Sequence, residues 1–199
     1  TRTTSSAASD VYKRQGVHHG SHIKWFGEKS DQHKKFHINY KNGDKDGNWR
    51  HWYSSGVDSL KATYLNGEKD GHWIWWRKNG LKDKEGFYKK EKKHGLWTVW
   101  NDSTGSAYHK LHEETYVNDA IDGKVTKWYK EGGLDRQGIM RGKEKEGEWT
   151  YWERGGKRWL KFDYGDGLEK VTLGEIEERD GITFKICLLY TSDAADEVV

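Results

Sequence analysis

The stretch YLNGEKDGHWIWWRKNG, Tyr64–Gly80, decides the fold that we predict for this chain. It contains two Asn-Gly dipeptides, Asn66-Gly67 and Asn79-Gly80, on either side of a run rich in tryptophan. Asn and Gly both tolerate positive φ, and two-residue turns with positive φ match the twist of paired strands. The stretch therefore predicts a β-hairpin.

The same pattern recurs at intervals of 24 residues, with one interval of 28. The tyrosine that opens it is found at Tyr40, Tyr64, Tyr88, Tyr116 and Tyr164, with Met140 in the same register. The glycine and first tryptophan that follow are Gly47, Trp49, Gly71, Trp73, Gly95, Trp97, Gly147 and Trp149, with Gly123 and Val125 at the equivalent positions. We assign these positions a structural role. A tandem repeat of this length indicates an array of similar units.

Turn glycines divide each unit into two short strands. They follow one another every 11 to 13 residues, for example at Gly43, Gly56, Gly67 and Gly80. This spacing predicts strands such as Trp49–Tyr53 and Ser59–Tyr64, with no helical periodicity between them. Consecutive hairpins of about 24 residues then predict an all-β fold, an elongated antiparallel meander.

Strand alternation separates the tryptophans onto two faces, because residues two apart share a face. One face is expected to carry Trp49 with Tyr53, and Trp73 with Trp75. The other is expected to carry the second tryptophan of each unit, and this row is the candidate binding surface: Trp52, Trp76, Trp100, Trp128 and Trp152. Two interpretations stay open, namely that the tryptophans only pack between repeats, or that one row also contacts a ligand.

The unit resembles the variant of the MORN repeat that is common in bacteria. The matching residues are Asn42-Gly43, Lys45-Asp46-Gly47, Asn66-Gly67, Lys69-Asp70-Gly71 and His94-Gly95, together with the tryptophan pairs, over Tyr40–Tyr164. The chain departs from the pattern at Glu91 and Asp119, which replace a turn glycine, at Val125, and at an insertion near Tyr108–Glu114. The resemblance implies an antitoxin-like, non-catalytic protein that binds a protein partner.

Both ends of the chain are expected to derive from laboratory DNA. Ser5–Gln15 and Cys187–Glu197 can be encoded by opposite strands of one oligonucleotide, which looks like a sequencing-library adaptor. We therefore assign residues 1–15 and 187–199 to adaptor sequence and leave them out of the fold prediction. The remaining divisions are a degenerate first repeat or cap at 16–39, regular repeats at 40–164, and a degenerate, truncated last repeat or cap at 165–186.

Charge and composition limit the classes of partner. The 35 basic and 32 acidic residues are interspersed and leave a net charge of +3, which argues against nucleic-acid binding. No apolar run reaches the length of a membrane span. The lysines of the Lys-Asp-Gly segments, which we expect to be solvated turns, suit a membrane surface, but Asp46, Asp70, Asp122 and Glu146 weaken that interpretation.

The sequence carries no recognisable catalytic or cofactor motif. G-x-S-x-G, H-E-x-x-H and the P-loop are all missing, so we expect no enzyme activity and no cofactor. His18, His19 and His22 lack cysteine partners, and we expect loop histidines there rather than metal ligands. The same interpretation applies to His109 and His112 in the insertion.

The sequence therefore supports two candidate functions. The first is a β-repeat interaction scaffold that binds a protein partner, with a cytoplasmic location favoured. The alternative is an exported carbohydrate-binding or cell-wall-binding aromatic array, because the unit also looks like the Trp/Tyr hairpin repeats that bind choline or glucan on bacterial cell walls.

Overall fold

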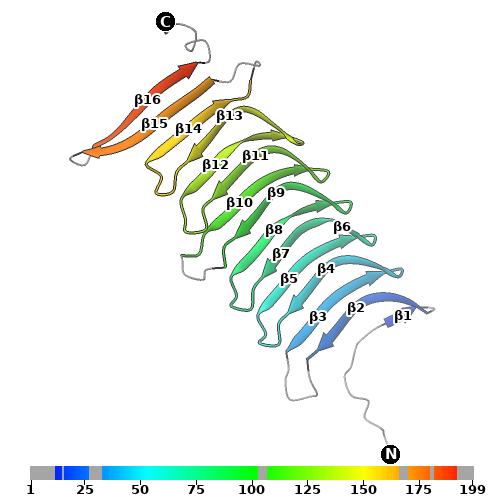
Figure 1. Ribbon diagram of the computed structural model, residues 1–199. Helices are drawn as coiled ribbons and strands as arrows, with labels where there is room; N and C mark the ends of the chain where they lie inside the picture. Colours follow the sequence, from blue (N-terminus) through cyan, green and yellow to red (C-terminus); the bar gives the residue numbers. More distant parts are fainter. Residues whose placement is uncertain are drawn as a thin grey trace, which may run out of the picture. The chain divides into compact units, whose positions relative to one another are not determined.

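The computed structural model describes residues 12–14, 16–26, 33–102, 107–165, 170–179 and 182–191. Every regular element in these ranges is a β-strand (Figure 1). They contain no helix that is long and apolar enough to cross a membrane. The chain divides into two compact units, Thr1–Gly95 and Leu96–Val199, which are described separately.

The first unit is an antiparallel meander in which strands pair in chain order, except that the short β6 pairs only with β5, which also pairs with β7. Its strands are β1 Tyr12–Arg14, β2 Val17–Trp25, β3 Lys34–Lys41, β4 Asp44–Trp52, β5 Asp58–Leu65, β6 Glu68–Lys69, β7 Gly71–Trp76 and β8 Lys82–Lys89. Strand β9, Lys92–Trp100, contains the boundary between the units.

The second unit repeats this arrangement. Its strands are β10 Lys110–Val117, β11 Ala120–Trp128, β12 Leu134–Arg141, β13 Glu144–Trp152, β14 Arg158–Asp163, β15 Lys170–Arg179 and β16 Ile182–Thr191. All adjacent pairs from β10 to β16 are antiparallel. The predicted all-β meander of hairpins, about 24 residues per repeat, is therefore confirmed.

Two-residue turns with positive φ close the hairpins at Asn42-Gly43 and Asn66-Gly67, as predicted. Asn79-Gly80 instead lies in the longer loop between Trp76 and Lys82, where Asn79 does not have a positive φ. Asn66 and Gly67 have φ of 49° and 86°. Lys90 and Glu91 adopt the same conformation, at 51° and 67°, although neither residue is a glycine. A left-handed conformation costs a residue with a Cβ about 1–2 kcal/mol, so neighbouring contacts have to hold this turn in place.

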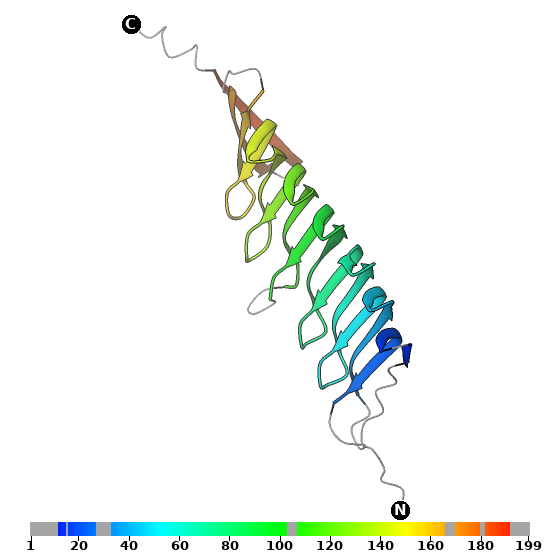
Figure 2. The ribbon, with the colours of Figure 1, turned by 90° about the vertical axis from the view of Figure 1, so that its right-hand side faces the viewer.

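The glycine before the first tryptophan does not lie in a turn, so the expected Lys-Asp-Gly turn is wrong. Ile38 pairs with Trp49 whereas Tyr40 pairs with Lys45, which leaves extra residues in β4, and Gly47 there has a φ of 83°. This irregularity is a β-bulge, which bends a strand. The hairpins bend near their two-residue turns (Figure 2).

The aspartate of each Lys-Asp-Gly segment anchors the next turn along the sheet. The amide of Asn66 donates to Asp46 Oδ2 at 3.3 Å, and the amide of Lys90 donates to Asp70 Oδ2 at 3.3 Å. The next amide in each turn donates to a backbone carbonyl of the preceding hairpin, for example Gly67 to Lys45 at 2.8 Å. These carboxylates therefore face turn amides, which explains their place in the repeat.

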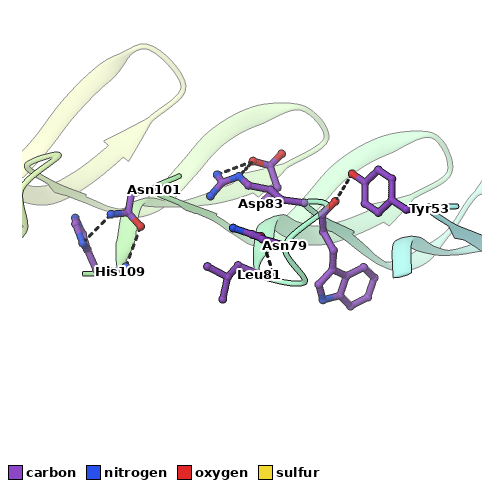
Figure 3. Close-up of polar contacts among 8 residues, drawn as sticks. Tyr53, Asn79, Leu81, Asp83, Asn101 and His109 are labelled. Carbon is purple, nitrogen blue, oxygen red and sulfur yellow. Dashed lines mark hydrogen bonds and ion pairs between the residues drawn. The ribbon is translucent and has the colours of Figure 1, made fainter. Parts of the chain in front are cut away.

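Loops at the opposite end of the hairpins are held by side chains (Figure 3). In the first unit the Tyr53 hydroxyl donates to the carbonyl of Trp76 at 2.7 Å, and Arg77 pairs with Asp83 at 2.7 Å. Strand β4 ends at Trp52, so Tyr53 lies in the loop and does not share a strand face with Trp49 as predicted. The irregularity between His51 and Trp52 ends the regular alternation at this point.

In the second unit the insertion falls between the end of β9 at Trp100 and the start of β10 at Lys110, where Asn101 and His109 contact each other. Asn101 is 1% exposed, and its Oδ1 accepts from the His109 amide at 3.0 Å (Figure 3). Strand β10 begins at Lys110 and has the same eight-residue length as β8. The insertion predicted near Tyr108–Glu114 therefore lies earlier, because β10 keeps the register of the repeat.

The segments assigned to adaptor sequence take part in the outermost strand pairs. Tyr12–Arg14 pairs with Val17–His19, and Cys187–Thr191 pairs with Lys170–Gly174. Backbone hydrogen bonding at a sheet edge accepts almost any side chain, so the pairing does not test their origin. The rest of both segments lies outside the described residues.

Candidate interaction surface

The sheet in each unit has two chemically different faces. We call one of them the aromatic face; in the first unit it carries Lys45, Trp49, Leu60, Ala62, Tyr64, Lys69, Trp73, Trp75 and Tyr88. In the second unit it carries His112, Glu114, Tyr116, Val125, Lys127, Lys145, Trp149 and Tyr151. The cross-strand pairs on this face of the first unit join aromatic, aliphatic, glycine, histidine and lysine residues and include no carboxylate.

The recurring feature of the aromatic face is a lysine held between two rings. Lys45 Nζ lies 4.6 Å from the ring centroid of Trp49 and 4.9 Å from that of Tyr64. The ammonium is attracted by the negative faces of both rings. Its partners come from the same strand, β4, and from the next strand, β5, so the contact links two strands.

The same triad of Lys, Trp and Tyr occurs in two further repeats. Lys69 Nζ lies 5.8 Å from the Trp73 ring and 5.2 Å from the Tyr88 ring. In the second unit Lys145 Nζ lies 5.2 Å from the Trp149 ring and 4.9 Å from the Tyr164 ring. The Tyr151 and Tyr164 hydroxyls accept from Lys145, and the Tyr151 contact is the main reason that the pKa of this lysine is raised.

The first tryptophan of each triad packs against a small residue on at least one neighbouring strand. Trp73 is 4% exposed, lies beside Ala62 and Gly86, and its indole N–H donates to the Thr63 carbonyl at 3.1 Å. In the second unit a Cβ placed on Gly138 would come within 2.3 Å of the Trp149 indole. The small residue two before the repeat's tyrosine is visible in the sequence, and we did not identify it there.

One repeat of the second unit lacks the whole triad. Ile121 replaces the lysine, Val125 replaces the tryptophan and Met140 replaces the tyrosine. We call this the substituted repeat. The three positions change together, which indicates that they act as one packing unit.

A buried carboxylate accompanies the substituted repeat. Glu114 is 8% exposed and pairs directly with Val125 across β10 and β11, at the position that Ala62 of the preceding strand occupies beside Trp73. Its Oε2 accepts from the Tyr116 hydroxyl at 2.6 Å, and its Oε1 lies 3.4 Å from Lys127 Nζ. The small side chain of Val125 leaves room for the Glu114 side chain, whereas a tryptophan at this position would need a small residue on the adjacent strand.

The contacts of Glu114 change the ionisation of the cluster. The imidazole of His112 lies 3.5 Å away and is the main cause of a pKa of about 2 for Glu114; burial opposes the shift, and Tyr116 and Lys127 add to it. Burial, followed by the hydrogen bond to Glu114, raises the pKa of Tyr116. The carboxylate is therefore ionised throughout the physiological range.

The opposite face, which we call the charged face, carries lysines and arginines that are paired with acids. In the first unit Arg50 binds Asp58 through two hydrogen bonds of 2.7 and 2.8 Å, and Lys82 Nζ lies 2.9 Å from Glu85. In the second unit Lys161 Nζ lies 2.6 Å from Glu148. Cations and anions alternate along the sequence, but the strand periodicity places most of these paired charges on this face.

The predicted binding row lies at the loop end of the hairpins. Trp52, Trp76, Trp100, Trp128 and Trp152 are the last residues of β4, β7, β9, β11 and β13. Trp100 is buried, and the other four are half-buried. The Arg50 guanidinium covers the Trp52 ring at 5.0 Å, and Lys61 covers the Trp76 ring at 5.3 Å. Side chains of the charged face thus cover these two rings.

The three histidines near the start of the array lie in strand β2, so the expected loop position is wrong. His18 stacks obliquely on Tyr40 at 5.3 Å between ring centroids, and His22 meets the edge of Phe36 at 5.2 Å. His18 and His22 extend the aromatic face of the first unit to β2, whereas His19 Nδ1 accepts from the Asn42 amide at 3.4 Å. Within the described ranges, no group of three or more His, Cys, Asp or Glu side chains is placed to hold a metal ion.

Comparison with known proteins adds no name to this arrangement. A scan against protein-family models gave no match, and a search of curated proteins gave none either.

Proposed function

We propose that this chain is a non-catalytic β-repeat interaction scaffold that binds a protein partner through its aromatic face. The observation that supports the proposal is the Lys-Trp-Tyr triad, which occurs on the aromatic face of each unit. Tryptophan and tyrosine are enriched where proteins recognise one another. The resemblance to bacterial MORN-variant, antitoxin-like proteins favours the same function.

The rings of the triads suit a protein partner better than a sugar. Carbohydrates stack on exposed indole faces, but the indoles of Trp73 and Trp149 are only 4% and 3% exposed, and a lysine lies over each. The carboxylates of an acidic polypeptide can instead form charge-assisted hydrogen bonds with the ammonium groups while these stay over the rings.

The proposal is tested by selecting peptides from a displayed random library on the immobilised chain. Enriched peptides are expected to lose affinity for the Lys45→Gln/Lys69→Gln variant, which changes two triad lysines. They should keep their affinity for the matched Lys61→Gln/Lys82→Gln variant, which removes two lysines from the charged face. Equal binding to both variants would show that the aromatic face is not the interaction surface.

The alternative, an exported carbohydrate-binding array, is tested on the same preparation with a glycan array. The exposed Trp25, 37% exposed at the end of β2, is the ring that favours this alternative. Glycan binding that is lost in Trp25→Ala, together with no enrichment of peptides, would replace the proposed function by this one.

A further inference from the structure

Successive triads lie one repeat apart along the sheet, and this distance sets the spacing between their lysines. Lys45 belongs to β4 and Lys69 to β6, and β5 is hydrogen-bonded to both strands. Neighbouring strands are about 4.7–4.9 Å apart, so equivalent positions two strands apart are separated by about 9.5 Å. The aromatic face of the first unit therefore offers cations at a regular spacing in the direction across the strands.

A polyproline II chain matches that spacing. It has three residues per turn and rises about 3.1 Å per residue, so every third side chain points the same way at intervals of about 9.3 Å. An extended β-strand turns alternate residues to opposite sides, and therefore does not present every third residue on one side. Aromatic surfaces are also the usual partners of chains in this conformation.

The charges on the aromatic face select an acidic partner. The cross-strand pairs of this face in the first unit include no carboxylate, because Asp46 and Asp70 are directed to turn amides. Lys45 makes no ion pair with any residue that the structure describes; its ammonium lies against the two rings, and its charge helps Lys69 to lower the pKa of Glu91. An anion that reaches it gains a charge-assisted contact without displacing an internal acid.

Glu91 indicates how a carboxylate meets a triad. Lys69 Nζ lies 3.0 Å from Glu91 Oε2 while it remains over the Trp73 and Tyr88 rings. The Lys69 side chain is 35% exposed, so its ammonium is reachable from solvent. A triad therefore accepts a carboxylate and keeps its cation–π contacts at the same time. At Lys69 a partner carboxylate has to share the ammonium, which has three N–H donors, with Glu91.

We propose that the aromatic face of the first unit binds an acidic, proline-rich segment in the polyproline II conformation, with a carboxylate at every third residue facing Lys45 and Lys69. The rings of Trp49, Tyr64, Trp73 and Tyr88, which the two lysines contact, offer an apolar surface beside the ammonium groups for the intervening residues. This inference rests on the proposed function and names the chemistry of the partner.

The test uses fluorescent synthetic peptides and measures their dissociation constants by anisotropy with the full chain. The probe is a repeated Glu-Pro-Pro peptide, compared with a repeated Glu-Pro-Pro-Pro peptide of equal net charge and with a repeated Lys-Pro-Pro peptide. We expect the Glu-Pro-Pro peptide to bind at least about tenfold more tightly than either comparison peptide, since one lost charge-assisted contact corresponds to about that factor. Binding should also weaken with added salt.

Variants then locate the site. Lys45→Gln/Lys69→Gln is expected to weaken binding of the Glu-Pro-Pro peptide by at least about tenfold, and Lys61→Gln/Lys82→Gln by less than about threefold. Glutamine keeps much of the aliphatic stem, and far-UV circular dichroism checks that each variant is folded. The Glu-Pro-Pro and Glu-Pro-Pro-Pro peptides are compared on the unmodified chain, so this comparison still tests the inference if a variant does not fold.

Two outcomes would overturn the inference. One is equal affinity for the two acidic peptides, which would mean that net charge rather than spacing is recognised. The other is equal loss of binding in the two lysine variants. If display selects peptides that need Lys45 and Lys69 but lack acids at every third residue, the proposed function stands and only the inference fails.

Discussion

The regular repeats of the first unit and the substituted repeat of the second unit solve one packing problem in two ways. In the first unit Trp73 fills the aromatic face between Ala62 and Gly86, and Lys69 lies over its ring. In the substituted repeat Val125 takes the place of the tryptophan, and Glu114 takes the place of a neighbouring small residue. The volume lost at one position is occupied by a side chain on the adjacent strand.

This difference shows that the repeat unit is a set of coupled positions rather than a list of favoured residues. A lysine over a ring is held only where the ring is present, and Ile121 occurs where both ring positions are aliphatic. Glu114 in turn stays charged because Tyr116, His112 and Lys127 surround it. Changes at one position should therefore depend on the residue at the others.

The largest expected effect is on the triad. Trp73→Ala should lower the free energy of unfolding by about 3–5 kcal/mol, because it removes a buried ring and leaves a cavity. Val125→Ala should cost only about 1–2 kcal/mol, since it removes two methyl groups. Urea unfolding followed by far-UV circular dichroism measures both. Equal losses would contradict the idea that the tryptophan is the main packing element.

Placing a tryptophan in the substituted repeat tests the coupling directly. Val125→Trp should destabilise the fold by about 1–3 kcal/mol, because the indole and Glu114 compete for the same space. Adding Glu114→Gly supplies a small neighbour like those beside Trp73. The loss of unfolding free energy in the double variant should therefore be smaller than the sum of the two single losses, by about 1 kcal/mol or more. Additive effects in a double-mutant cycle would show that the two positions are independent.

The ionisation of Glu114 makes the substituted repeat sensitive to acid. Its pKa is lowered from the usual 4.5 to about 2 in the folded chain, so its contribution to stability is complete above pH 4.5 and is lost as the pH falls towards 2. Glu114→Gln should remove that part of the pH dependence and cost about 1–3 kcal/mol at neutral pH. Urea titrations between pH 2 and 7 measure both, and an unchanged pH profile would contradict the assignment.

The smallest effect concerns the turn that lacks glycine. Glu91→Gly relieves the left-handed conformation but removes the carboxylate that accepts from the Lys69 amide at 2.5 Å, so the net change in stability should stay within about 1 kcal/mol. The local effect is clearer: hydrogen exchange of the Lys69 amide should become faster. The Asn66-Gly67 turn of the neighbouring hairpin serves as the internal reference, and unchanged protection of Lys69 would disprove the anchoring role.

Much of the array could be predicted from local signals. Asn66-Gly67 specifies its turn because both residues tolerate positive φ, and the 24-residue spacing specifies successive hairpins. The pairing of Trp73 with Trp75 on one face also follows from strand alternation. The face of Tyr53 was predicted wrongly, because the strand ends at Trp52 after an irregularity that no local residue signal announces.

The candidate site was harder to predict than the fold. The row containing Trp52 and Trp76 stood out because tryptophan is conspicuous, whereas Lys45 and Lys69 looked like exposed turn residues beside acids. A bulge at Gly47 and at Gly71 places each lysine on the aromatic face and turns the adjacent aspartate to the next hairpin. The sequence contains the glycine, but its effect on side-chain direction depends on the strand register.

By itself, the sequence determined that this protein is a tandem array of β-hairpins, because turn conformation and strand alternation depend on residues a few positions apart. The tertiary structure alone decided which charges are paired and which lie over rings. Lys45 and Tyr64, or Glu114 and Lys127, are separated by more than ten residues along the chain and meet only when neighbouring strands are in register. Long-range pairing thus converts an evenly mixed sequence into one charged face and one aromatic face.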